Sequence, residues 1–249
     1  MKRDLLNSQI QDWRKLDGKD VLYAVLNNEA NAGVAVSSSF GAESAVLLSL
    51  VAEIDPSTPI LTVDTGKLFV ETLRYREELV DHLGLTNVQI ETSPSGFVNS
   101  SDPDGDLHLS NPDLCCQVRK VMPHALAAAN YDILITGRKR HHGGGRAALP
   151  TANVEGQHIK INPLATWSQD QIEAHFEAKG LPRHPLVAEG FLSIGCETCT
   201  RRTSSHEAPR AGRWAGQNKT ECGLHMSMND TGATGANDSY QFELTEYGQ

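Results

Sequence analysis

The sequence has no hydrophobic run long enough to cross a membrane, for which about 20 consecutive apolar residues are needed. The first residues, Met1 to Ser8, contain no apolar stretch of the kind found in secretory signals. We therefore expect a cytoplasmic protein with no membrane partner. The five cysteines are then expected to be reduced, which favours metal binding or catalysis over a disulfide framework.

A basic surface is also missing. The 249 residues carry a formal net charge of −9, whereas nucleic-acid-binding domains usually show a positive footprint. We expect no nucleic-acid partner. The sequence contains neither a Walker A motif nor a G-x-G-x-x-G motif, so the common ATPase and dinucleotide-binding functions are disfavoured.

Short apolar segments alternate with helical patterns along the first 180 residues. Strands are expected at 32–37, 59–63, 87–91, 131–136 and 158–162, and helices at 42–53, 68–83, 114–129 and 168–179. This alternation predicts an α/β fold with a doubly wound, mainly parallel sheet. The chain is less regular after residue 180, and the composition of 226–249 predicts a disordered tail.

A serine-rich loop follows the first expected strand, at the sheet edge where α/β proteins bind ligands. It reads Ser37-Ser38-Ser39-Phe40-Gly41. Small residues, hydroxyls and the start of the next helix would together suit a phosphate group. An ordinary serine-rich helix cap is the alternative, and the loop alone favours neither.

The cysteines form two pairs and one single residue. A Cys-x-x-Cys pair such as Cys196 and Cys199 fits a zinc knuckle, a redox pair or two core thiols. Adjacent residues such as Cys115 and Cys116 do not easily reach one tetrahedral zinc, but they can reach two irons of a cubane. We predict a [4Fe–4S] cluster on these four thiols, with zinc or free thiols as alternatives. Cys222 is left over.

Positive charge gathers at Arg138–Arg146, Arg201–Arg202 and Arg210–Arg213. Arginine forks suit phosphate and sulfate oxygens, although each group by itself also fits a solvated surface. His141 and His142 are expected on the surface rather than on a metal.

Together these motifs resemble the assimilatory sulfonucleotide reductases, most closely the iron–sulfur adenylyl-sulfate reductases. The resemblance covers about residues 32–225. The segments that carry it are Ser37–Ser44, Asp64–Gly66, Cys115-Cys116 with Arg119-Lys120, Ile135–Arg138, Ser193–Arg201, Gly212–Trp214 and Lys219–His225.

The resemblance implies a fold of the PP-loop (adenine nucleotide hydrolase-like) type with an irregular C-terminal segment. It implies that adenylyl sulfate is reduced to sulfite and AMP in sulfate assimilation. Cys222 would attack the substrate sulfur to form S-sulfocysteine, and thioredoxin would release sulfite. No second Cys-x-x-Cys domain follows Cys222, so this reductant is expected from outside the chain.

The resemblance also implies one domain over 1–225, with a nucleotide-binding core at about 20–180 and a cluster and catalytic segment at about 181–225. The substrate-binding residues that it implies are Ser37, Ser38, Ser39, Phe40, Gly41, Asp64, Lys120, Gly137, Arg146, Arg210, Arg213 and His225. A 3′-phosphoadenylyl-sulfate reductase and, further off, a PP-loop tRNA-thiolating enzyme are the alternatives. Homo-oligomerisation stays open.

Overall fold

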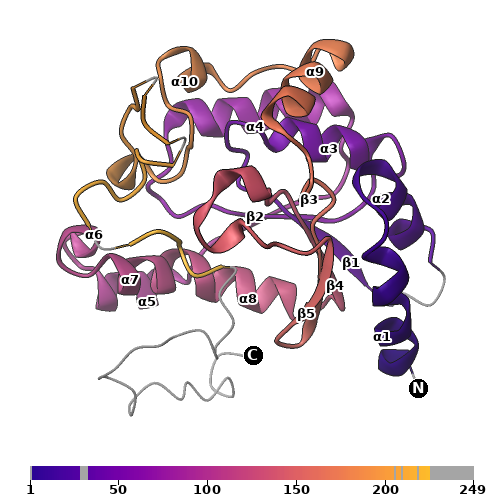
Figure 1. The fold of residues 1–249 in the computed structure, drawn as a ribbon. Coiled ribbons are helices and arrows are strands. Elements are labelled where there is room, and N and C mark those ends of the chain that lie inside the picture. Colours follow the sequence, from indigo (N-terminus) through magenta and orange to yellow (C-terminus); the bar gives the residue numbers. More distant parts are fainter. Residues whose placement is uncertain (1, 29–32, 205, 209, 218, 225–249) are drawn as a thin grey trace.

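The computed structural model describes residues 2–28, 33–204, 206–208, 210–217 and 219–224, with side chains from residue 8 onward (Figure 1). A six-stranded sheet in the order β3-β2-β1-β4-β6-β5 lies at its centre. The strands are β1 (Val34–Ser37), β2 (Ile60–Val63), β3 (Val88–Glu91), β4 (Ile133–Thr136), β5 (Ala152–Glu155) and β6 (His158–Ile161).

The described α-helices are α1 (Lys2–Trp13), α2 (Gly18–Leu26), α3 (Ser44–Ala52), α4 (Val70–Leu83), α5 (Ser95–Ser101), α6 (Leu107–Ser110), α7 (Pro112–Cys116), α8 (Met122–Ala128), α9 (Gln169–Lys179) and α10 (Pro185–Ala188). The π-helix η1 (Gln117–Val121) joins α7 to α8. Three 3₁₀ turns follow, η2 (Arg140–His142), η3 (Gly144–Arg146) and η4 (Glu197–Cys199).

The sheet confirms the predicted doubly wound, mainly parallel α/β fold. Every neighbouring pair of strands is parallel except β5 and β6, which form an antiparallel hairpin. Strand β5 was not predicted. Its turn depends on Gly156, which has a φ of +62°, a left-handed conformation that glycine adopts without a steric penalty.

The strands are covered on both faces, which explains their nearly continuous apolar sequences. Figure 1 shows α3, α4 and α9 on one side of the sheet, and α7 and α8 on the other. The larger core cluster lies under α2, α3, α4 and α9, and the smaller one under α8. Successive residues alternate between the faces, so Val36 and Ile135 enter the larger cluster while Ala35 and Leu134 enter the smaller.

Two helix starts follow the sequence signals. Ser168 caps α9 in a capping box with Gln171, as its spacing predicts. Asn111 caps α7 by accepting a hydrogen bond from the backbone N–H of Leu114, and Pro112 occupies the first turn. The helix expected at 114–129 is present over 112–128, but it contains the π turn η1 directly after Cys116, which was not predicted. Such π turns often lie at functional sites.

The segment after α9 is irregular, as expected, and pairs with the core at isolated points. Cys196 forms an antiparallel bridge with Leu68, at the carboxyl end of β2, and Thr200 forms another with Arg213. The predicted disordered tail and His225 lie outside the described residues. Within the described part of the chain, none of the helices has the length and apolar character that a membrane crossing requires.

Candidate functional site

A pocket opens at the carboxyl ends of β1, β2 and β4, as expected for a doubly wound sheet. Its empty volume is about 1340 Å³, which includes space open to solvent. The lining includes ten of the predicted residues: Ser37, Ser38, Ser39, Gly41, Lys120, Gly137, Arg146, Arg210, Arg213 and Cys222.

Phe40 and Asp64 are placed differently from the other predicted residues. The side chain of Phe40 is 1% exposed and packs in the larger core, so a ligand in the pocket can meet only its backbone. Phe40 has a φ of +47°, a strained value for a non-glycine residue, and its N–H donates to the Ser38 hydroxyl at 3.2 Å. Asp64 accepts a hydrogen bond from the Gly66 N–H at 2.9 Å, which fixes the turn after β2.

His124 is a pocket residue that the sequence reasoning missed. Its Nε2 lies 2.8 Å from the hydroxyl of Ser37. Burial, reinforced by the charge of Lys160, lowers the pKa of His124 to about 4, so the ring is neutral near pH 7. The available signal was its spacing of four residues from Lys120, which also lines the pocket.

The structure brings the four paired cysteines together. Cys115 and Cys116 are buried at the end of α7, Cys196 directly precedes η4, and Cys199 is its last residue. Burial, followed by the influence of the other three thiols, raises the pKa of Cys115 to about 11. Thr65 connects the two pairs, which are 80 residues apart in sequence: its hydroxyl lies 3.3 Å from Sγ of Cys196, and its carbonyl accepts a hydrogen bond at 3.1 Å from Arg119, three residues after Cys116.

Lys120 lies four residues after Cys116 and lines the pocket together with Cys222. It comes from η1, whose wide turn follows Cys116. Burial opposes its charge, but Cys196 and Cys222 outweigh burial and raise the pKa of Lys120. The pKa of Cys196 is lowered overall. Burial acts to raise it, but the charge of Lys120 and a hydrogen bond with the Thr65 hydroxyl at 3.3 Å outweigh burial.

Arg146 and Arg210 meet at one carboxylate, that of Glu221, the residue before Cys222. Arg146 donates from Nε and Nη2 to the two oxygens of Glu221, at 2.7 and 2.9 Å. Arg210 donates to Oε2 of Glu221 at 3.1 Å. We predicted that these arginines bind an anion of the substrate. In the structure they bind an anion of the chain itself, the Glu221 carboxylate, to which the sequence analysis assigned no function.

Arg213 takes a different position on the pocket wall. Its guanidinium carbon lies 4.3 Å from the ring centroid of Trp214, and it passes so close to Gly195 that a Cβ there would lie 2.3 Å from Nη2. Within the described residues, Nε of Arg213 and Nε1 of Trp214 are buried without a hydrogen-bond partner.

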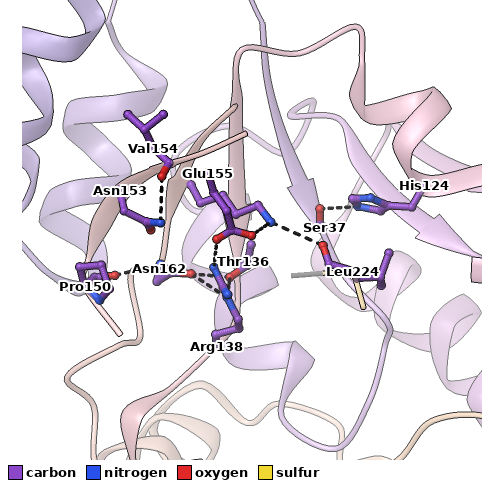
Figure 2. Close-up of polar contacts among 11 residues, drawn as sticks. Ser37, His124, Thr136, Arg138, Pro150, Asn153, Val154, Glu155, Asn162 and Leu224 are labelled. Atoms are coloured by element: carbon purple, nitrogen blue, oxygen red, sulfur yellow. Dashed lines mark hydrogen bonds and ion pairs between the residues drawn. The ribbon is translucent and has the colours of Figure 1, made fainter. Parts of the chain in front are cut away.

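The cations Arg138, Lys139 and Arg140 have internal partners. Figure 2 shows Arg138 beside Thr136, Asn162 and Glu155, and its Nη2 lies 3.4 Å from the Glu155 carboxylate. Lys139 pairs with Glu43 at 2.8 Å, and Arg140 donates to a backbone carbonyl, that of Leu149, at 2.8 Å.

The second basic group, Arg201 and Arg202, does not line the pocket. Both side chains are exposed and pair with Glu207 and Glu189 respectively. Of the three basic groups in the sequence, this one stays on the surface.

His141 and His142 are half-buried rather than on the surface. Together with Glu43 they offer three metal-ligating atoms within 4.8 Å of one another. The ammonium group of Lys139 already contacts the Glu43 carboxylate, and a second cation there would be repelled. We therefore assign no metal to this group, in keeping with the prediction that the histidines are not ligands.

Comparison with known proteins gives consistent results. The model of the phosphoadenosine phosphosulfate reductase domain matches residues 33–202. The chain is 48% identical over 194 residues to the adenosine 5′-phosphosulfate reductase of Chelativorans sp. (strain BNC1), covering 78% of this chain and 79% of that one. It is 48% identical over 203 residues to the protein of the same name from Mesorhizobium japonicum, covering 82% and 80%.

One solved structure supports the fold. The crystal structure of phosphoadenylyl-sulfate reductase from Candida auris, a phosphate complex, superposes with a TM-score of 0.64 at 24% identity, over 77% of this chain and 93% of that one. At this identity the likeness concerns the architecture alone. It agrees with the fold that the sequence motifs imply.

Proposed function

Because this chain belongs to the phosphoadenosine phosphosulfate reductase domain family, we propose that it reduces adenylyl sulfate to sulfite and AMP. The observation that carries the proposal is that Cys222 lines the same pocket as the loop after β1. A thiol and an anion-binding strand end are the two parts that transfer of a sulfonate group from a nucleotide requires. Relatives that are 48% identical carry the matching name.

In the proposed reaction the Cys222 thiolate attacks the sulfur of the bound substrate. The bond between this sulfur and the phosphate oxygen breaks, and AMP leaves with the electron pair. Cys222 is left as S-sulfocysteine. A thiolate of external thioredoxin then attacks Sγ of Cys222 and releases sulfite, and the second thioredoxin thiol resolves the mixed disulfide. This thiol chemistry suits a reducing compartment such as the cytoplasm.

Positive charge favours the step in which AMP leaves, because negative charge develops on its phosphate. Lys120, Arg146, Arg210 and Arg213 all line the pocket that holds Cys222. A guanidinium such as that of Arg213 suits a phosphate or sulfate oxygen. The backbone of the loop from Ser37 to Gly41 would receive the remaining oxygens.

The cysteine quartet fits a [4Fe–4S] cluster. The four thiols are free, and Thr65 connects Cys196 to the turn that follows Cys116. We propose that Cys115, Cys116, Cys196 and Cys199 hold the cluster, because four thiolates are the usual ligand set. When bound there, the cluster would supply an electrostatic field next to Lys120.

We propose adenylyl sulfate rather than its 3′-phosphorylated form as the substrate. Relatives that are 48% identical carry the name adenosine 5′-phosphosulfate reductase. A 3′-phosphate would need its own cation, and the pocket cations Arg138 and Lys139, which would have to supply it, are buried in ion pairs with Glu155 and Glu43. Measurement of kcat/KM for both nucleotides tests this choice. We expect at least a tenfold preference, which corresponds to about 1.4 kcal/mol. Equal values would contradict the assignment.

The direct test of the function is sulfite release from adenylyl sulfate by anaerobically purified protein, with and without thioredoxin. Cys222→Ser should keep AMP binding and lose sulfite release. Unaltered protein given substrate without thioredoxin should gain the mass of a sulfonate on the peptide that contains Cys222. An active Cys222→Ser variant, or a sulfonate on another peptide, would refute the assignment.

A further inference from the structure

The pairing of Glu221 with two arginines has a consequence for binding. Arg146 and Arg210 are largely buried, with side chains 14% and 19% exposed, and both face the Glu221 carboxylate. Burial, together with the nearby charge of Arg146, lowers the pKa of Arg210 to about 10. Two guanidinium groups opposite one carboxylate leave a net positive charge in the pocket. A dianion such as a phosphate would neutralise this charge more fully.

We propose that Glu221 is an internal anion that occupies the nucleotide's anion subsite while the pocket is empty. Its two oxygens stand where oxygens of the phosphosulfate group would accept hydrogen bonds from Arg146 and Arg210. Nucleotide binding replaces the carboxylate on these arginines, and departure of AMP lets the carboxylate return. Glu221 is thus a positioning residue that couples the state of the pocket to the position of Cys222. This inference rests on the proposed function.

The position of Glu221 in the chain makes the coupling direct, because the next residue is Cys222. The same short segment has further contacts with the rest of the protein, among them an ion pair between Lys219 and Asp113. Arg210 donates to the carbonyl of Thr220 at 2.9 Å, and Nζ of Lys160 lies 3.5 Å from the carbonyl oxygen of Leu224. Figure 2 shows this last contact beside the Glu155 carboxylate. When Glu221 leaves the arginines, the segment loses the contact next to Cys222 but keeps the Lys219–Asp113 ion pair, which holds its start.

The charge-neutral variant Glu221→Gln separates this inference from a purely structural role. If the carboxylate competes with nucleotide, its neutralisation removes the competitor, and AMP binds more tightly. If the carboxylate only holds the arginines in place, AMP binds more weakly. Hydrogen bonds between charged partners make contributions that correspond to about tenfold or more in affinity. We expect the Kd for AMP to fall by about that factor.

The matched control is Glu207→Gln. Glu207 accepts two hydrogen bonds from Arg201, at 2.6 and 3.1 Å, which closely resemble those that Glu221 accepts from Arg146. Glu207 belongs to the same irregular segment but does not line the pocket. We expect the Glu207→Gln variant to bind AMP with the same Kd as the unaltered protein. In an Arg146→Ala background, Glu221→Gln should give a clearly smaller gain, because Arg146 no longer pairs with the carboxylate.

A second measurement uses the unaltered protein and does not depend on how a variant folds. Inorganic sulfate should compete with Glu221 for the arginines and loosen the segment, so it should accelerate alkylation of Cys222 by iodoacetamide in the cluster-loaded protein. Peptide mass mapping locates the label, and sodium chloride at equal ionic strength is the control. Glu221→Gln should react quickly without sulfate.

Each possible result of these experiments either supports or overturns the inference about Glu221. Tighter AMP binding in Glu221→Gln with sulfate-dependent alkylation in the unaltered protein supports the inference. Weaker or unchanged AMP binding in the variant, or alkylation that sulfate does not accelerate, overturns it while leaving the proposed function in place. An unaltered protein that binds no AMP at all would overturn the proposed function and this inference together.

Discussion

Replacing Glu155 with glutamine should destabilise the fold strongly. The carboxylate of Glu155 lies between Arg138 and Lys160, and the three side chains are 12%, 9% and 7% exposed. Glutamine keeps the shape and removes the charge, so two buried cations face each other without compensation. Breaking a buried ion pair in this way costs about 3–5 kcal/mol, because the remaining charge is poorly solvated.

The chain offers a control with the same connectivity and a different environment. Glu53 also bridges two cations, Lys19 at 2.6 Å and Lys179 at 2.7 Å, but these lysine side chains are 50% and 45% exposed. Exposed pairs contribute about 0.2–1 kcal/mol each, because water screens the charges and solvates whichever partner remains. Glu53→Gln should therefore cost much less than Glu155→Gln.

Urea unfolding and thermal unfolding, followed by circular dichroism, measure both variants. In a chain of this size each kcal/mol lowers Tm by about 2–4 °C, so Glu155→Gln should lower it by about 6–20 °C and Glu53→Gln by a few degrees at most. Equal losses in the two variants would refute the reasoning, since burial is the main difference between the two carboxylates.

The pH dependence of Glu155→Gln provides an independent check. Burial already lowers the pKa of Lys160 from its ordinary value of 10.5 in the unaltered protein, and loss of the Glu155 charge lowers it further. A lysine with a lowered pKa binds fewer protons in the folded state than in the unfolded one. Stability therefore rises as pH rises from that lowered pKa toward 10.5. The deficit of the variant should shrink in alkaline buffer, and a deficit that grows there would contradict this account.

Three further predictions concern the site. Anaerobically purified protein should carry iron and sulfide in about equal amounts, near four of each per chain, and stoichiometric zinc without iron would exclude the cluster. Gly195→Ala should displace the Arg213 guanidinium from the pocket wall and raise KM for adenylyl sulfate about tenfold or more. The control is Gly96→Ala, whose Cβ would meet nothing within 4 Å and which should leave KM unchanged. Stability should fall as pH falls from 6.5 toward 4, because His124 is held neutral in the fold, and urea unfolding should show a shallower dependence in His124→Gln.

Much of the fold could be predicted from the sequence because its signals are local. The five predicted strands lie within two residues of their observed positions, and the capping box at Ser168 placed the start of α9. Strand β5 was missed because Ala152–Glu155 is short, lies at the sheet edge and depends on pairing with β6. The π turn at Gln117–Val121 was missed because it has no distinct local pattern.

The sequence by itself determined the chemistry available to this protein: four thiols in two pairs, a fifth thiol, a small-residue strand end and clustered arginines. Tertiary structure alone decided how these groups are used. It buried Arg138 among Thr136 of β4, Glu155 of β5 and Asn162, which follows β6, and it placed Glu221 on Arg146, 75 residues away in sequence. Pairing and burial of charges depend on which distant groups meet and how much water is excluded around them. A linear pattern contains the charges but does not specify these contacts.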